Sequence, residues 1–211
     1  MGISDSFNAY YGLVFTREDT STLPIPVTIF TDSDDSLLSD VSFTLQDVRE
    51  QLDKLRIDKA AGADGLFPRL LVETKDEICY PLYIIFKKLF SETCIPDDWK
   101  SANITPIYKK GSRNLAENYR PVSLTSQTCK MFESILRDAL VEHLEKNALI
   151  TDSQHGFRKG RFCLTNLLTF LDKVTGYVDS GSSVDAIFLD FAKAFDKVPH
   201  QRLAAKLISH G

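Results

Sequence analysis

Apolar positions recur with helical spacing over much of the chain. After Thr44, the side chains of Leu45, Val48, Leu52 and Leu55 fall on one helical face, and Thr-Leu-Gln-Asp at 44–47 resembles a capping box. We expect this helix to run until Gly62 and Gly65 end it. The same spacing predicts a short helix opened by Pro68 and longer helices over Ile78–Phe90, Thr128–Lys146, Thr165–Val178 and His200–Ser209.

Two segments alternate in the manner of short β-strands. Residues 102–108 and 119–124 are joined by a polar loop with Gly111 at its turn, which predicts a two-stranded ribbon with a basic tip. Both strands contain proline, which is typical of edge positions. A third candidate, the continuous apolar run 186–189, predicts a buried strand that ends at Asp190 and is followed by a short helical turn over 192–197.

The first 43 residues show little helical periodicity. They hold an aromatic cluster (Phe7, Tyr10, Tyr11, Phe15), followed by two prolines and an acidic stretch between residues 24 and 35. We interpret residues 1–43 as a linker or as an arm packed on a neighbouring element.

Composition excludes several classes of protein. No apolar run approaches the ~20 residues of a membrane-spanning helix, and no secretory signal is present, so the sequence predicts an intracellular protein without deciding between nucleus and cytoplasm. The four cysteines form no Cys-x-x-Cys pair, which favours reduced, mostly buried thiols. The net charge is −4, yet residues 100–161 carry eleven bases and six acids, a local charge of +5. Such a segment can be an anion-facing surface or simply a solvated face of mixed charge.

Asp190 is the most informative single residue, because a carboxylate at the end of a buried strand needs compensation. A divalent metal, a helix N-terminus or a cation could compensate the buried charge. The local pattern supports a structural role for Asp190 and a metal site equally. Asp196, six residues later, can simply cap the next helix.

Five ordered motifs carry a resemblance to a known family. They are Lys59-Ala-Ala-Gly-Ala-Asp-Gly65, Pro96-Asp-Asp-Trp-Lys100 with Ile104-Thr-Pro-Ile-Tyr-Lys-Lys-Gly111, Asn118-Tyr-Arg-Pro-Val-Ser-Leu124, Gln154-His-Gly-Phe-Arg-Lys-Gly-Arg161, and Phe188-Leu-Asp-Phe-Ala-Lys-Ala-Phe-Asp196 followed by Lys-Val-Pro-His. In this order they resemble the reverse transcriptases of non-LTR (LINE-like) retrotransposons. Residues 7–19 resemble the segment that usually precedes this domain, so the resemblance covers essentially the whole chain.

The resemblance implies a catalytic role for the last motif. Asp190 would be a catalytic residue and a ligand of Mg²⁺, a hard cation that prefers carboxylate and phosphate oxygens. Phe191 would offer its backbone to the metal site. Phe195 would lie under the sugar of the nucleotide and exclude a 2′-hydroxyl.

The resemblance also implies roles for the bases. Lys109, Lys110 and Arg120 would bind the nucleoside triphosphate, since a guanidinium can hold phosphate oxygens in two places. The template-binding residues would be Arg158, Lys159 and Arg161, through sequence-independent phosphate contacts. The implied partners are an RNA template, a DNA primer and deoxynucleoside triphosphates, with no membrane.

The fold class implied is α+β, a partial right-hand polymerase. Residues 44–180 would be mostly helical fingers with a short β-ribbon, and residues 181–211 the first strand and helix of the palm. The Tyr/Phe-x-Asp-Asp hairpin that supplies the other metal carboxylates is absent. Asp34-Asp35 and Asp97-Asp98 lack the aromatic residue two positions earlier, so neither pair replaces it.

We therefore expect a polymerase fragment whose palm completion and thumb are missing and which is inactive when isolated. Two further hypotheses stay open at this stage. The chain could be a non-catalytic nucleic-acid-binding module, for example the product of a relic reading frame, or a structural fragment whose exposed palm surface aggregates or binds a protein.

Overall fold

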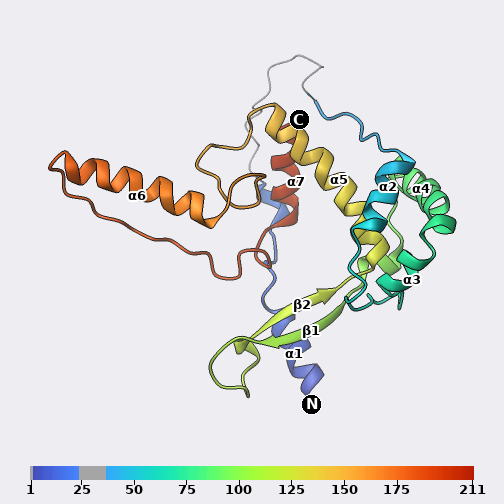
Figure 1. Cartoon of the computed structure of the whole chain (residues 1–211). Coiled ribbons are helices and arrows are strands. Elements are labelled where there is room, and N and C mark those ends of the chain that lie inside the picture. The colour runs from blue at the N-terminus through green and yellow to red at the C-terminus, as the bar shows by residue number, and fades with distance from the viewer. Residues whose placement is uncertain (1, 24–36) are drawn as a thin grey trace.

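The computed structural model describes residues 2–23 and 37–211, arranged as in Figure 1. The α-helices are α1 (Ile3–Gly12), α2 (Leu45–Asp53), α3 (Pro68–Glu73), α4 (Lys75–Ser91), α5 (Gln127–Lys146), α6 (Cys163–Asp179) and α7 (His200–Ser209). The strands are β1 (Asn103–Tyr108) and β2 (Tyr119–Leu124), and the short 3₁₀-helices are η1 (Thr20–Thr22), η3 (Asp97–Lys100) and η4 (Ala116–Asn118). The prolines and acidic residues noted between positions 24 and 35 lie outside the described residues. The mixture of helices and a small sheet agrees with the α+β class.

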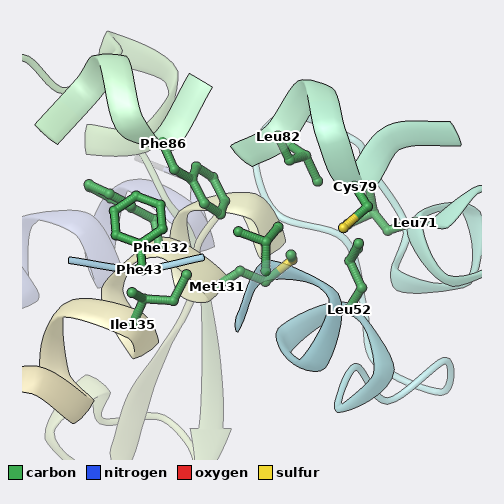
Figure 2. Packing of buried hydrophobic residues seen from close by; sticks show 10 residues of the cluster. Phe43, Leu52, Leu71, Cys79, Leu82, Phe86, Met131, Phe132 and Ile135 are labelled. Atoms are coloured by element: carbon green, nitrogen blue, oxygen red, sulfur yellow. The ribbon is translucent and has the colours of Figure 1, made fainter. Parts of the chain in front are cut away.

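The hydrophobic core lies where α2, α4 and α5 meet. Leu52, Phe86 and Met131 come from these three helices and are almost completely buried (Figure 2). The Phe86 ring lies 5.2 Å from that of Phe132, which adds an aromatic contact to the area buried. Since full burial of such a side chain contributes about 1.5 to 3 kcal/mol, this three-helix contact anchors the described fold.

The start of α2 confirms the capping box. The Thr44 hydroxyl accepts from the Asp47 backbone N–H at 3.3 Å, and the Asp47 carboxylate accepts from the Thr44 N–H at 2.7 Å. The predicted end is wrong, because α2 stops at Asp53 rather than near Gly62. The residues from 54 onward turn away, which carries Gly62 to the backbone of Ser126 at the start of α5.

The β-ribbon is confirmed, with β1 antiparallel to β2. Pro106 lies opposite Pro121 in the register. The Lys109 N–H donates to the Asn118 carbonyl at 2.8 Å, so these two residues form a hydrogen-bonded pair. Hydrogen-bonded and non-hydrogen-bonded pairs alternate along an antiparallel ladder, so Pro106 and Pro121 form a non-hydrogen-bonded pair that needs no N–H donor. The ribbon therefore accommodates both prolines at once.

The predicted buried strand over 186–189 is wrong. Residues 183–191 have no regular structure, and Ile187 and Leu189 are 85% and 90% exposed. A strand is stable only when neighbouring backbone pairs with it, and in the described ranges the sheet contains only β1 and β2. The strand expected at residues 186–189 is thus not formed here, whereas the turn over 192–197 and helix α7 follow as predicted.

The N-terminal arm contains a helix that the sequence interpretation missed. α1 is supported at its start by the Asp5 carboxylate, which accepts from the Gly2 N–H at 2.8 Å. Phe7, Tyr10 and Tyr11 follow helical spacing, and the Phe7 ring meets that of Tyr119 edge to face at 4.9 Å. α1 therefore packs on the β-ribbon at Tyr119, the residue before Arg120 on β2.

Candidate functional site

Three exposed cations lie on the β-ribbon. Lys109 and Lys110 follow β1 directly, and Arg120 lies on β2 opposite Ile107. Within the described ranges, none of these three side chains has a hydrogen-bond or ion-pair partner. They are therefore available to an anionic ligand.

The loop that begins with Lys109 and Lys110 is held by its own hydrogen bonds. The Tyr108 hydroxyl donates to the Gly111 carbonyl at 2.6 Å, and the Tyr119 hydroxyl donates to the Arg113 carbonyl at 2.9 Å. Gly111 has a φ of +85°, and a Cβ there would lie 2.8 Å from the Asn118 amide, so the turn favours glycine. The Arg113 guanidinium lies over the Tyr108 ring at 4.6 Å. Sequence reasoning missed this fourth cation, although it stands in the same polar loop.

The turn before α6 is tied to the helix by a buried histidine. The His155 Nδ1 atom lies 2.9 Å from the Thr165 Oγ1 atom, and His155 is only 8% exposed. The same Thr165 oxygen accepts from the Phe162 N–H at 3.0 Å. These contacts fix the path of residues 155–162, which include the three bases expected to contact template.

Two of those three bases contact the chain itself. The Arg158 guanidinium lies 3.4 Å from the Glu145 carboxylate and donates to the Thr151 carbonyl at 3.1 Å. Arg161 pairs with the Asp152 carboxylate at 3.0 Å. Lys159, in contrast, is exposed and has no partner among the described residues. Arg158 and Arg161 are thus held by contacts within the chain, whereas Lys159 is available to an anionic ligand.

The segment with Asp190 is open to solvent. Asp190 is exposed, and Phe191 is 84% exposed. In residues 2–23 and 37–211, no three His, Cys, Asp or Glu side chains are grouped so that they could hold a metal ion. The described residues therefore do not complete a metal site around Asp190.

One aromatic contact joins two predicted site segments. The Phe157 ring meets the Phe195 ring edge to face, with centroids 6.0 Å apart and planes at 88°. Phe157 belongs to the turn that carries Lys159, and Phe195 follows Asp190 by five residues. The turn before α6 and the Asp190 segment consequently lie beside each other.

Comparison with protein families decides which family this arrangement belongs to. Residues 107–211 match the family model described as reverse transcriptase (RNA-dependent DNA polymerase). The match includes the end of β1, all of β2, the turn before α6 and the Asp190 segment. The chain belongs to the reverse transcriptase family. The family resemblance carried by the ordered motifs is thereby confirmed.

Similar proteins extend the match beyond these residues. The chain described here is 29% identical over 164 residues to the RNA-directed DNA polymerase from mobile element jockey of Drosophila melanogaster, and the match covers 77% of this chain and 18% of that protein. It is 26% identical, with the same coverage, to the probable RNA-directed DNA polymerase from transposon BS of the same organism. A type-1 retrotransposable element R2 polyprotein of Popillia japonica is 24% identical over 148 residues, with 70% and 20% covered.

The chain spans about a fifth of the length of these curated relatives. Across the part of the chain that the structure describes, no helix is both long and apolar enough to span a bilayer.

Proposed function

We propose that this chain is part of an RNA-directed DNA polymerase of a non-LTR retrotransposon. In this proposal, residues 44–180 form the fingers and residues 181–211 the start of the palm of a right-hand polymerase. The longer protein would join deoxynucleotides to a DNA primer on an RNA template. The contact between Phe157 and Phe195 is the observation that carries the proposal, because it brings the predicted template turn beside the predicted catalytic segment.

The exposed cations fit different roles within such a site. Lys109, Lys110 and Arg120 would bind the phosphates of the incoming nucleotide, with the arginine fork holding two oxygens at once. Phe195 would lie under the sugar and disfavour a 2′-hydroxyl. Lys159 would contact a template phosphate, which positions the template without reading its sequence.

Asp190 would be a Mg²⁺ ligand in the longer protein, with the backbone of Phe191 beside it. Two metal ions held about 4 Å apart for phosphoryl transfer need several carboxylates. The described residues provide no such group, so further carboxylates would have to come from other residues of the polymerase. We therefore expect residues 1–211 alone to bind substrates without synthesising DNA.

The decisive experiment measures template-dependent incorporation by residues 1–211 and by a longer form that continues through palm and thumb. The longer form should incorporate nucleotides, and Asp190→Asn should abolish incorporation while primer-template binding persists. Asp185→Asn removes an exposed acid five residues earlier and serves as the matched control. Synthesis by the longer form that survives Asp190→Asn would overturn the catalytic role, and synthesis by residues 1–211 that Asp190→Asn abolishes would overturn the expected inactivity.

The nucleotide site is tested separately. In the longer form, Arg120→Ala should lower nucleotide use about tenfold to a hundredfold, the equivalent of the ~1.5 to 3 kcal/mol of a charge-assisted contact. Arg69→Ala removes an exposed arginine of α3 and should have no such effect. Equal effects of both substitutions would argue against a nucleotide-binding role for Arg120.

A second candidate function is nucleic-acid binding without catalysis. The exposed side chains of Lys109, Lys110, Arg120 and Lys159, which have no partner in residues 2–23 and 37–211, favour it because they leave phosphate-binding capacity on the chain. Binding of a primer-template should weaken as salt rises, since each neutralised phosphate releases counterions. Binding that is insensitive to salt would contradict this candidate.

A further inference from the structure

The N-terminal arm contacts the turn and helix that follow Asp190. The Thr16 hydroxyl donates to the Lys197 carbonyl at 3.0 Å. The Lys193 ammonium donates to the Tyr10 hydroxyl at 2.6 Å and lies 4.3 Å from the centre of the Tyr10 ring. These contacts join residues about 180 positions apart in the chain, at the beginning and at the end of the turn over 192–197.

Glu18 makes the most specific of these contacts. Its carboxylate accepts from the backbone N–H of Gln201 at 3.0 Å and from that of Arg202 at 3.2 Å. The Arg202 guanidinium lies 3.3 Å from the same carboxylate, and the Glu18 side chain is 11% exposed. One carboxylate thus joins the arm to the first turn of α7.

The start of α7 needs such a group. The residue before the helix is Pro199, which has no side-chain acceptor, and the helix has no acidic residue in its first turn. The first N–H groups of an α-helix lack intrahelical partners, and the helix dipole favours negative charge at this end. Glu18 therefore supplies from the arm the cap that the local sequence of α7 does not contain.

The same arm is attached to the nucleotide-binding ribbon. Phe7 of α1 packs against Tyr119 at 4.9 Å, and Tyr119 precedes Arg120 on β2. Figure 1 shows α1 beside the two strands, with the chain then rising to α7. The arm thus connects the element that carries Arg120 with the segment that carries Asp190 and Phe195.

We propose that residues 2–18 are a positioning arm and that Glu18 is a positioning residue for the Asp190 segment. By capping α7, Glu18 fixes one end of the 192–197 turn, while Tyr10 fixes Lys193 at the other end. The functional consequence, that the arm sets where Asp190 and Phe195 stand relative to Arg120, rests on the proposed polymerase function. The structural consequence, that Glu18 and Tyr10 hold the two ends of the 192–197 turn, does not depend on that function.

Hydrogen exchange of the 211-residue chain tests the structural part without any polymerisation. Loss of a helix cap should speed exchange of the Gln201 and Arg202 amides about tenfold in Glu18→Ala, and exchange of residues 193–198 should rise with it. Glu18→Gln keeps one carbonyl acceptor and should give an intermediate effect. Arg202→Gln, which removes the ion pair but keeps the N–H donors, should change less than Glu18→Ala.

The controls separate positioning from general destabilisation. Glu77→Ala removes an exposed acid on α4 and should leave residues 193–202 unchanged. Exchange of the buried α5 residues Met131 and Phe132 should also stay unchanged in Glu18→Ala. Unchanged exchange at 193–202, or a uniform rise that includes α5, would overturn the role of Glu18.

Kinetics of the longer form test the functional part. Glu18→Ala should change kcat or the KM for nucleotide by about tenfold while the Kd for primer-template stays the same, with Glu18→Gln partly restoring the value. Faster local exchange without a kinetic effect would overturn the positioning role in catalysis, while the structural role of Glu18 as the cap of α7 would stand. If the longer form shows no polymerase activity at all, the proposed function fails, and the exchange result stands by itself.

Discussion

Gly62 lies so close to Ser126 that a Cβ atom at position 62 would stand 2.5 Å from the Ser126 backbone nitrogen. The next contact secures the same junction, because the Gln127 side-chain amide donates to the Ala60 carbonyl at 3.1 Å. The motif that contains Gly62 is thus packed against the point where β2 passes into α5. This packing explains a glycine at position 62 without any ligand.

Gly62→Ala should therefore destabilise the fold. Backbone cannot yield as a flexible side chain can, so the added methyl group should lower the free energy of unfolding by about 1 to 3 kcal/mol. Urea denaturation followed by Trp99 fluorescence measures the change. Gly12→Ala is the matched control, because nothing lies within 4 Å of a Cβ at that position. Equal stability of the Gly62→Ala variant and the unmodified chain would contradict the close packing.

The capping box of α2 makes stability depend on acid. Hydrogen bonds from the Thr44 N–H and hydroxyl lower the pKa of Asp47 below its ordinary value. A lowered pKa in the folded state stabilises the protein above the unfolded pKa of about 4, and this contribution is lost as the pH falls through the folded pKa. Asp47→Asn should therefore flatten the fall in unfolding free energy between pH 5 and pH 2.

Thr44→Ala tests the other half of the same capping box. This substitution should lower the free energy of unfolding by about 1 kcal/mol at pH 7, where both hydrogen bonds of the capping box are formed. Denaturation at a series of pH values distinguishes this substitution from Asp47→Asn. Asp98→Asn removes an exposed acid without a partner in the described residues and should leave the pH profile unchanged. A profile that Asp47→Asn also leaves unchanged would contradict the predicted linkage.

The cysteines divide into two buried and two exposed thiols, so the expectation of mostly buried thiols holds for only half of them. Cys79 and Cys129 are buried, whereas Cys94 and Cys163 are exposed. Burial raises the pKa of Cys129 to about 12 and also raises that of Cys79. At pH 8, the buried thiols therefore lack both access to reagent and the reactive thiolate form.

A thiol reagent should accordingly modify two cysteines of the folded chain quickly and the other two only after unfolding. Mass spectrometry of peptides labelled at pH 8 identifies the sites. The double variant Cys94→Ser with Cys163→Ser should show no fast labelling. Fast modification of Cys129 in the folded double variant would contradict the buried position of this residue.

The elements that local sequence controls were predictable, and those that need a distant partner were not. The capping residues of α2 and the Gly111 turn lie within a few residues of the structure they determine. The run 186–189 has the composition of a buried strand, but a strand forms only beside another strand, which these residues do not find. Glu18 shows the same limit, because no local pattern connects it with a helix that begins at residue 200.

The candidate site follows the same rule. Sequence reasoning identified Arg158, Lys159 and Arg161 as one basic group, and it could not separate them, since their partners depend on how the chain turns after α5. Asp152 lies between α5 and the turn, where it meets Arg161 and lies 3.9 Å from Arg158. The two arginines therefore stabilise the turn through contacts within the chain.

Lys159 and Arg158 should consequently respond to substitution in opposite ways. Lys159→Ala should leave unfolding unchanged, weaken primer-template binding and reduce the slope of log affinity against log salt by about 0.7 to 0.9, the value of one phosphate contact. Arg158 is largely buried and pairs with Glu145, so Arg158→Ala should lower the free energy of unfolding by about 1 to 3 kcal/mol. Thermal denaturation and binding measured at several salt concentrations separate the two effects, with Lys173→Ala on α6 as an exposed lysine control. A variant Arg158→Ala that keeps its stability but loses one phosphate contact would show that this arginine leaves Glu145 to bind template. An unchanged salt slope in Lys159→Ala would show that Lys159 makes no phosphate contact.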